Sequence, residues 1–96
     1  MTQAKGHING QNDQHQIAFY GISTCIWCRK TRHFLEENSV TFDFTYVDLL
    51  DPQEMKSIKE IVRRWNPSVS FPTTVIDNEQ CVIGYKPDTL KEILEL

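Results

Sequence analysis

Short β-type segments alternate with helical segments along this chain, and this order restricts the possible folds more than any other feature of the sequence. Residues 17–20 (IAFY) are apolar and aromatic and stop at Gly21, which is typical of a strand. Residues 26–37 (IWCRKTRHFLEE) contain no Gly or Pro and carry apolar side chains at helical spacing, so they predict a helix. Residues 42–47 (FDFTYV) alternate apolar with polar side chains and predict a second strand.

The second half of the chain predicts a helix, a hairpin and a last helix. Residues 51–54 (DPQE) combine an N-cap acid, Pro at the first helical position and Glu at the third, and apolar residues at helical spacing follow until Asn66. Residues 73–76 and 81–85 are two β-type runs joined by turn-forming residues, which indicates a hairpin. Pro87 begins the last helix.

The predicted order of elements is therefore β-α-β-α-β-β-α. A strand, a helix and a second strand make a parallel pair with a right-handed crossover, whereas the hairpin is antiparallel within itself. We expect an α/β fold in which a four-stranded mixed sheet carries helices on both faces. This folded domain spans residues 17–96, which leaves room for one domain only.

Residues 1–16 differ from the rest of the chain. Gly, Asn, Gln and His dominate this segment and no apolar periodicity runs through it, so it predicts a mobile tail. Metal binding by His7 and His15 is the functional alternative, but no pair of carboxylates accompanies them.

Composition excludes several classes of protein. Ten Lys and Arg residues against thirteen Asp and Glu residues give a net charge of −3, which argues against binding nucleic acid through a basic face. No apolar run approaches the ~20 residues that cross a bilayer, and residues 1–16 are too polar for a secretory signal. Three cysteines are too few for a secreted disulfide scaffold, so we expect the protein in the reducing cytoplasm. We also expect it to be a monomer.

The chemistry is concentrated in the pair Cys25 and Cys28, where the first strand gives way to the first helix. Unpaired N–H groups and the positive end of the helix dipole stabilise an anion there, so we expect Cys25 as a thiolate nucleophile. Four basic residues crowd the first turns and add positive potential: Arg29, Lys30, Arg32 and His33. Cys28 lies nearly one helical turn further on, so it should be less exposed and should resolve the bond that Cys25 forms.

Structural zinc is the main alternative for a C-x-x-C pair, and it needs two further ligands. The chain offers only Cys81 on a predicted strand and His33 on the helix, and it has no second C-x-x-C. We therefore expect no bound metal. Cys81 itself is interpreted as a small apolar strand residue, with a redox role as the alternative.

Three motifs in order give the chain a resemblance to a known family. They are Phe19-Tyr20 leading into residues 24–28 (TCIWC), residues 71–75 (FPTTV) and residues 84–88 (GYKPD). With these motifs, residues 17–96 resemble the glutaredoxin-like branch of the thioredoxin superfamily. The resemblance implies the thioredoxin fold, disulfide reductase activity and a cis peptide bond before Pro72.

The same resemblance suggests where substrates bind. A cis bond before Pro72 would turn the Phe71 backbone outward, where it can pair with an extended thiol peptide; alternatively, Pro72 only begins a strand whose first amide needs no partner. The resemblance also implies that the turn at Gly84 and Tyr85 borders the site. Trp27 is expected on the rim, offering an apolar face to the partner, or alternatively packs as an ordinary helix residue. Two further residues near the end of the second predicted helix, Arg63 and Arg64, either hold a carboxylate of a peptide thiol or form a solvated helix end.

The resemblance leaves the source of electrons open. Many glutathione-using members have Lys shortly before the first cysteine and Pro-Tyr between the two; this chain has residues 21–24 (GIST) and Ile26-Trp27 there. Tyr85 stands at the second position of their Gly-Gly turn. Residues 84–88 look closer to redoxins that supply ribonucleotide reductase and are reduced by a flavoprotein reductase.

We therefore predict a dithiol–disulfide oxidoreductase that reduces protein or small-molecule disulfides through Cys25 and Cys28, with disulfide-containing proteins as its expected partners. It needs no bound metal or organic cofactor, and either glutathione as co-substrate or a thioredoxin-type reductase supplies its electrons. Two alternatives are an iron–sulfur or metal carrier of the same fold, and a binding module without turnover. The intact pair of thiols counts against the binding module.

Overall fold

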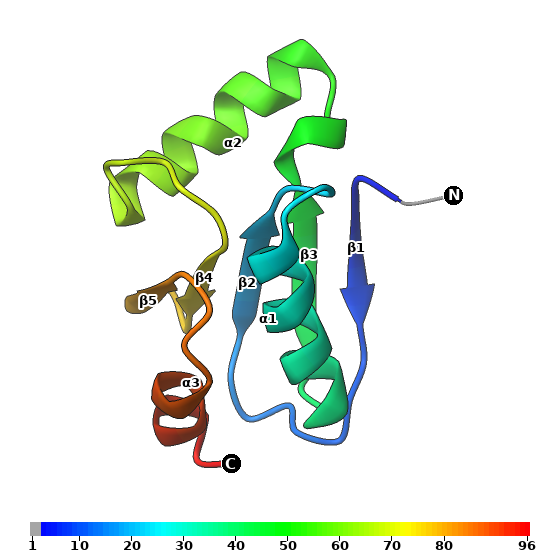
Figure 1. Ribbon diagram of the computed structural model, residues 1–96, viewed down its shortest axis with the longest axis vertical. Coiled ribbons are helices and arrows are strands. Elements are labelled where there is room, and N and C mark those ends of the chain that lie inside the picture. Colours follow the sequence, from blue (N-terminus) through cyan, green and yellow to red (C-terminus); the bar gives the residue numbers. More distant parts are fainter. Residues whose placement is uncertain (1–2) are drawn as a thin grey trace.

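A parallel strand pair joined by a helix forms the centre of the molecule (Figure 1). In this computed structural model, which describes residues 3–96, β2 (Ile17–Gly21) and β3 (Phe42–Tyr46) run parallel, and α1 (Ile26–Glu37) connects them. The bounds of α1 are those predicted from the sequence. The parallel pair with a helical crossover is confirmed.

Two further strands extend the sheet on the other side of β2. β4 (Thr73–Ile76) pairs antiparallel with β2, and β5 (Gln80–Ile83) pairs antiparallel with β4. The predicted hairpin is therefore confirmed, although its second strand ends at Ile83 and not at residue 85. It ends there because Gly84 takes a φ of +85° and donates its N–H to the carbonyl of Pro72 at 2.8 Å, outside the strand pairing.

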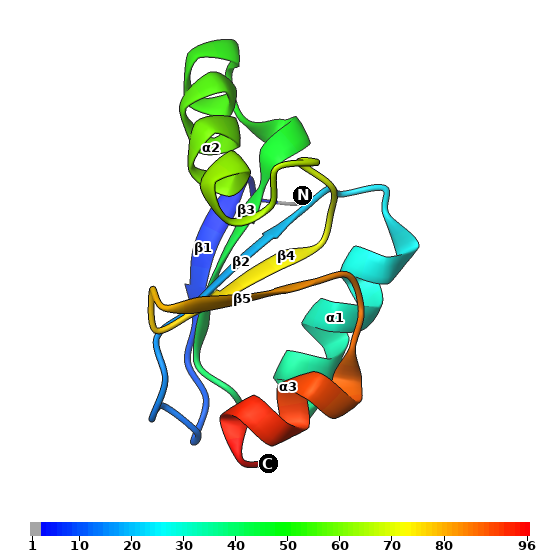
Figure 2. The ribbon, with the colours of Figure 1, turned by 90° about the vertical axis from the view of Figure 1, so that its left-hand side faces the viewer.

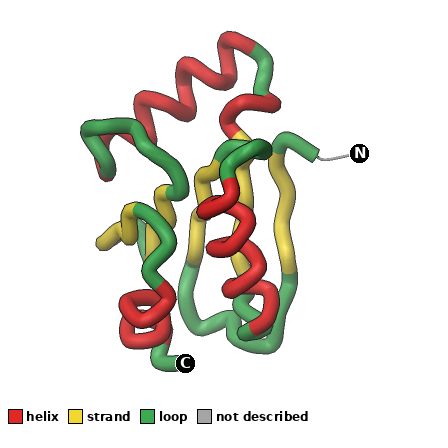
Figure 3. Tube along the Cα trace, in the orientation of Figure 1, coloured by secondary structure: helices red, strands yellow, loops and turns green. Residues whose placement is uncertain are grey.

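A fifth strand corrects the prediction of four strands and of a mobile tail over residues 1–16. β1 (Lys5–Ile8) pairs antiparallel with β3, and the order across the sheet is β1-β3-β2-β4-β5. Figure 3 shows β1 as a strand at the right-hand edge of the sheet. Residues 1 and 2 of the predicted tail lie outside the described residues.

Close contacts explain why this polar segment is held in place. The Gly6 backbone lies so near Phe44 that a Cβ atom there would stand 2.8 Å from the ring. A Cβ atom at Gly10 would stand 2.1 Å from the carbonyl oxygen of Ser39. His7 and Asp43 share a hydrogen bond of 2.6 Å across the β1–β3 pair. The segment therefore docks through its glycines and polar groups, without the apolar pattern expected of a buried strand.

Helices cover both faces of the sheet, as predicted. α1 and α3 (Pro87–Leu94) lie on one side, and α2 (Pro52–Trp65) lies on the other (Figure 2). A short 3-10 turn, η1 (Val47–Leu49), leads from β3 towards α2. Asp51 caps α2 by accepting the Glu54 N–H at 2.8 Å, which confirms the helix start predicted from the sequence.

The core lies between the sheet and the α1–α3 layer. Phe19 at its centre is fully buried and meets Phe42 and Tyr46 edge to face, each with ring centroids 6.4 Å apart. Leu35 of α1 and Leu90 of α3 are fully buried in the same cluster. This packing fixes α1 on the sheet and with it the position of the first cysteine. No helix within residues 3–96 is long and apolar enough to span a bilayer.

Candidate active site

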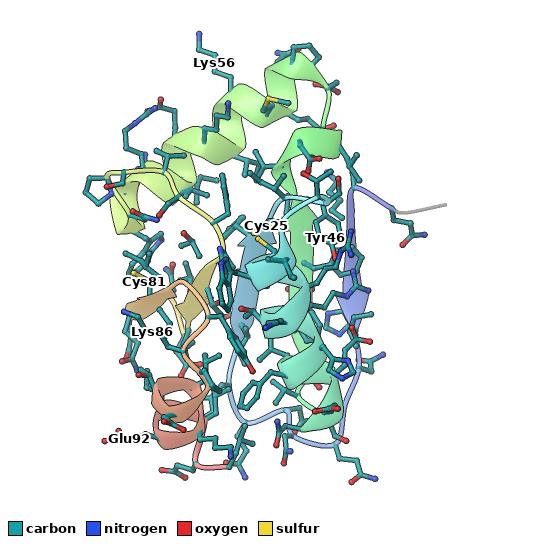
Figure 4. All side chains as sticks on the ribbon, in the orientation of Figure 1. Cys25, Tyr46, Lys56, Cys81, Lys86 and Glu92 are labelled. Carbon is teal, nitrogen blue, oxygen red and sulfur yellow. The ribbon has the colours of Figure 1, made fainter. Side chains whose placement is uncertain are left out.

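Cys25 lies at the start of α1, where β2 ends (Figure 4). A turn brings it there, because the N–H of Cys25 donates to the carbonyl of Ile22 at 3.1 Å. Its backbone is extended and its sulfur caps the helix, accepting the Cys28 N–H at 3.3 Å. An anionic sulfur at this point gains from the N–H groups of the first turn and from the helix dipole. The side chain is half-buried and reaches the surface.

Cys28 lies behind Cys25 and has no exposed surface. The Ile22 N–H donates to its sulfur at 3.4 Å, and a Cβ atom on Gly21 would stand 3.2 Å from its Cβ. Burial first, and then the hydrogen bond to Cys25, raise the pKa of the Cys28 thiol to about 12. Both cysteines are free thiols. The predicted difference in exposure between the two sulfurs is confirmed.

A carboxylate that sequence reasoning missed anchors the loop before Cys25. Asp48 in η1 accepts the Ser23 N–H at 2.9 Å with one oxygen and the Ser23 hydroxyl at 2.5 Å with the other. The negative charge of Asp48 is also a minor cause of the raised pKa of Cys28. A sequence signal existed, since β2 and β3 were expected to be parallel and the residues that follow them emerge at the same edge of the sheet.

The loop between α2 and β4, called the proline loop because it contains Pro72, lies beside the end of the sheet that carries Cys25. The peptide bond between Phe71 and Pro72 is cis, as the resemblance implied. Pro72 is fully buried, whereas Phe71 is half-buried and lines a hollow together with Ile22 of the cysteine loop. The structure thus brings Phe71 and Pro72 to the loop that carries Cys25, although whether they bind substrate stays a prediction.

Trp27 and Tyr85 form one aromatic stack at the surface. Their ring centroids are 6.2 Å apart and the ring planes differ by 25°. Lys30 lies over the Trp27 ring at 4.8 Å from its centroid, and 53% of Trp27 remains exposed. Trp27 is therefore both packed and exposed, so its position is compatible with both interpretations, the rim of the site and ordinary helix packing. The stack also joins the turn at Gly84 and Tyr85 to the start of α1.

The basic residues of α1 divide into two groups. Arg32 is tied to structural partners: its guanidinium lies 4.2 Å from the Phe44 ring centroid and donates to the Tyr46 hydroxyl at 2.9 Å, and its Nε bonds Glu36. His33 pairs with Glu37 of the next turn. Arg29 and Lys30 are exposed and have no carboxylate within 4.0 Å among residues 3–96.

The two arginines near the end of α2 are not equivalent. Arg63 lines the hollow that Phe71 and Ile22 also line, together with Lys59 one turn earlier. Arg64 is exposed and is not part of that lining. Of the two arginines, only Arg63 borders the hollow, and its guanidinium already pairs with Glu60 on the same helix.

The remaining cysteine and histidines have structural partners. The Cys81 thiol donates to the carbonyl of Trp65 at 3.4 Å. His7 bonds Asp43, and His15 bonds Asp77 at 2.7 Å. Over the described part of the chain, no three His, Cys, Asp or Glu side chains are grouped so that they could hold a metal ion.

A mixed sheet that feeds a cysteine-capped helix, with a cis-proline loop beside it, defines a protein of the thioredoxin superfamily. Within that superfamily, the glutaredoxin family model matches residues 17–82, which is more than half of the chain. The chain therefore belongs to the glutaredoxin family.

Solved structures agree with this assignment, and one curated protein is similar over most of its length. A glutaredoxin from Methanosarcina mazei Go1 shares 42% identity and a TM-score of 0.90, over 98% of this chain and 90% of that one. Methanoredoxin from Methanosarcina acetivorans shares 41% identity and a TM-score of 0.87, over 91% and 90%. The Gene 56 protein of Mycobacterium phage D29 is 30% identical over 82% of each chain.

Proposed function

We propose that this protein is a dithiol–disulfide oxidoreductase that reduces disulfides in protein substrates through Cys25 and Cys28. One observation carries the proposal: an accessible sulfur caps a helix, and a second, fully buried thiol lies one turn behind it. The reaction needs these two sulfurs and no bound metal or organic cofactor. Such a reaction belongs in a reducing compartment, the cytoplasm.

The first step forms a mixed disulfide. The Cys25 thiolate attacks one sulfur of the substrate disulfide, which breaks the S–S bond and forms a new one to Cys25. The second substrate sulfur leaves as a thiolate and takes a proton from water. The Cys28 N–H, 3.3 Å from the Cys25 sulfur, stabilises the attacking anion before the step and is released from it as the bond forms.

The second step releases the substrate. Cys28 loses its proton and attacks the Cys25 sulfur, so the mixed disulfide breaks and a bond between Cys25 and Cys28 forms. The substrate leaves with two thiols, having gained two electrons and two protons. Because the pKa of the Cys28 thiol is about 12, little of it is ionised at neutral pH, and this step waits for proton removal in the mixed disulfide.

The substrate chain would lie along the hollow beside the cysteine loop. Ile22 and Phe71 give this hollow an apolar side next to Cys25, and Lys59 supplies a cation within it, whereas Arg63 is paired with Glu60. On the opposite flank, the exposed ring of Trp27 and its partner Tyr85 offer an apolar surface. Contact with substrate by Trp27, Phe71, Gly84 and Tyr85 is part of the proposal, whereas the fully buried Pro72 would act by holding Phe71 beside the site.

Substitution of each cysteine tests the mechanism. Cys25→Ser should abolish disulfide reduction, because no accessible thiol remains at the start of α1: Cys28 is buried and Cys81 lies on β5. Cys28→Ser should stop after the first step and accumulate a mixed disulfide that mass spectrometry detects. Retained dithiol turnover in the Cys25→Ser protein would contradict the assigned roles.

The electron source is tested separately. One coupled assay contains glutathione and its reductase, and the other contains a thioredoxin-type flavoprotein reductase. Because Ile26-Trp27 and Tyr85 differ from the pattern of many glutathione-using members, we expect turnover with the flavoprotein. Turnover only with glutathione would contradict that expectation while leaving the dithiol mechanism intact.

A further inference from the structure

Two hollows flank the loop that carries Cys25, and both are rich in cations. The α1 hollow, about 410 Å³, is lined by Ile26 next to Cys25 and by residues of α1 and β3. The α2 hollow, about 420 Å³, is lined by Ile22 on the other side of Cys25 and by residues of η1, α2 and the proline loop. A polypeptide placed across Cys25 would therefore meet one hollow on each side.

Positive charge is concentrated in these two hollows. Half of the ten Lys and Arg residues line them: Arg29, Lys30 and Arg32 in the α1 hollow, Lys59 and Arg63 in the α2 hollow. Only two of the thirteen acidic residues do so, Glu36 and Asp48. The whole chain carries a net charge of −3, so this face has the opposite sign to the average of the molecule.

The carboxylates in the hollows are already engaged, whereas several of the cations are not. Glu36 bonds Arg32, and Asp48 bonds Ser23 through both of its oxygens. By contrast, no carboxylate among residues 3–96 lies within 4.0 Å of Arg29, Lys30 or Lys59. Cations near the start of α1 also oppose the helix dipole, so their presence there does not serve helix stability.

We propose that this face docks an acidic polypeptide, so that the preferred substrates are protein disulfides flanked by Asp and Glu. The inference rests on the proposed function and names its substrate class. Apolar Ile22 and Ile26 would lie next to the disulfide, and the unpaired cations on both sides would attract the flanking carboxylates. Attraction of this kind mainly raises the rate of encounter and weakens as salt is added.

Single-turnover kinetics with pre-reduced protein test the preference without any choice of electron source. Three peptides of equal length carry the same disulfide, flanked by Asp and Glu, by Ser and Gln, or by Lys. At low salt we expect severalfold faster reduction of the acidic peptide than of the neutral one, and slower reduction of the basic one. The differences should shrink as the Debye length falls from about 30 Å at 0.01 M salt to about 8 Å at 0.15 M.

Paired variants locate the effect. Arg29→Gln with Lys59→Gln removes one unpaired cation from each hollow and should lower the acidic-to-neutral rate ratio severalfold. Lys56→Gln with Lys91→Gln removes the same charge from outside the hollows and should leave the ratio unchanged. Lys56 is a matched control because it lies on α2, as Lys59 does, but points away from the site (Figure 4).

The outcomes separate this inference from the proposed function. Reduction of all three peptides at one rate, or a ratio that both variant pairs leave unchanged, would overturn the docking surface alone. Reduction of none of them would overturn the proposed function. In that case calorimetric titration with the acidic peptide, its cysteines replaced by serine, still tests docking. Inhibition by inorganic polyphosphate as strong as by that peptide would show a general anion surface, against the proposal.

Discussion

The two sulfurs of the site are three residues apart and experience different surroundings. Cys25 faces solvent at the end of a helix, whereas Cys28 sits against Gly21 and Ile22 with no exposed surface. Exposure determines which sulfur a substrate reaches first, and burial keeps the other protonated until it is needed. The order of the two exchange steps therefore follows from packing around the first turn of α1.

The pKa of Cys28 makes the stability of the reduced protein depend on pH in the alkaline range. Burial raises it from 9.0 to about 12, so above about pH 9 the unfolded thiol loses its proton while the folded one keeps it. The stabilising contribution of the Cys28 thiol to the free energy of unfolding is fully present below pH 9 and is lost as pH rises towards 12. In urea unfolding of the reduced protein, Cys28→Ser should show a smaller alkaline loss of stability than the unsubstituted protein. Equal losses would contradict the raised pKa.

Asp48 should stabilise the loop before Cys25. Asp48→Ala removes the acceptors of both Ser23 hydrogen bonds. Each hydrogen bond to a charged group contributes about 1.5–3 kcal/mol to the free energy of unfolding, and less at an exposed site such as this one. Ser23→Ala removes only the hydroxyl bond and should cost less. Urea denaturation measures both, with Asp88→Ala as an exposed acidic control. A loss for Ser23→Ala as large as for Asp48→Ala would contradict the two-bond arrangement.

The cysteine pair at the start of a helix was predictable from residues close in sequence. The contact between Ser23 and Asp48, which are distant in sequence, was not. The positions of Cys25 and Cys28 at a helix start follow from residues close in sequence. The bond from Ser23 to Asp48 joins residues 25 positions apart and depends on how far β2 and β3 extend. Sequence pattern predicts that strand ends meet at an edge, but not which side chains touch there.

Among the elements, β1 shows where sequence pattern fails. Its four residues contain Gly6, only one large apolar residue, Ile8, and two charged or polar ones, so no alternation typical of a strand stands out. The strand lies at the edge of the sheet, where it pairs antiparallel with β3. The other strands and all three helices were predictable because each carries its own periodicity or cap.

The docking of β1 should weaken as pH rises through the pKa of His7. The hydrogen bond to Asp43, and then that to Asn9, raise the pKa of His7 above 6.5. The bonding of charged His7 is therefore fully present below pH 6.5 and is lost as pH rises through the raised pKa. Hydrogen-exchange protection of the β1 amides should therefore fall as pH rises above 6.5. Asp43→Asn should flatten this dependence, and an unchanged dependence in that variant would contradict the pairing.

On the scale of the whole molecule, the sheet separates the N-terminal segment from the cysteines. β1 pairs only with β3, whereas Cys25 follows β2. Its contacts stabilise the sheet edge, including the packing of Gly6 under Phe44. The fold of residues 17–96 is therefore expected to persist without the first sixteen residues, at lower stability.

Removal of residues 1–16 tests this separation. The shortened protein should unfold at a lower temperature, by about 4–8 °C for each kcal/mol by which its free energy of unfolding falls. It should also self-associate more, because the edge of β3 becomes exposed. Single-turnover reduction of a neutral disulfide peptide should continue. Calorimetry, light scattering and stopped-flow kinetics measure the three effects, and loss of peptide reduction in a folded shortened protein would contradict the separation.

The stack of Trp27 on Tyr85 ties the segment between the two cysteines to the turn that precedes α3. Trp27 lies within the ring that would close if Cys25 and Cys28 joined, so any adjustment of that segment would displace an indole whose neighbour comes from far along the chain. The emission of this tryptophan should then differ between the dithiol and disulfide forms. The fluorescence of Trp27 would thus report the redox state of the two cysteines without an added dye.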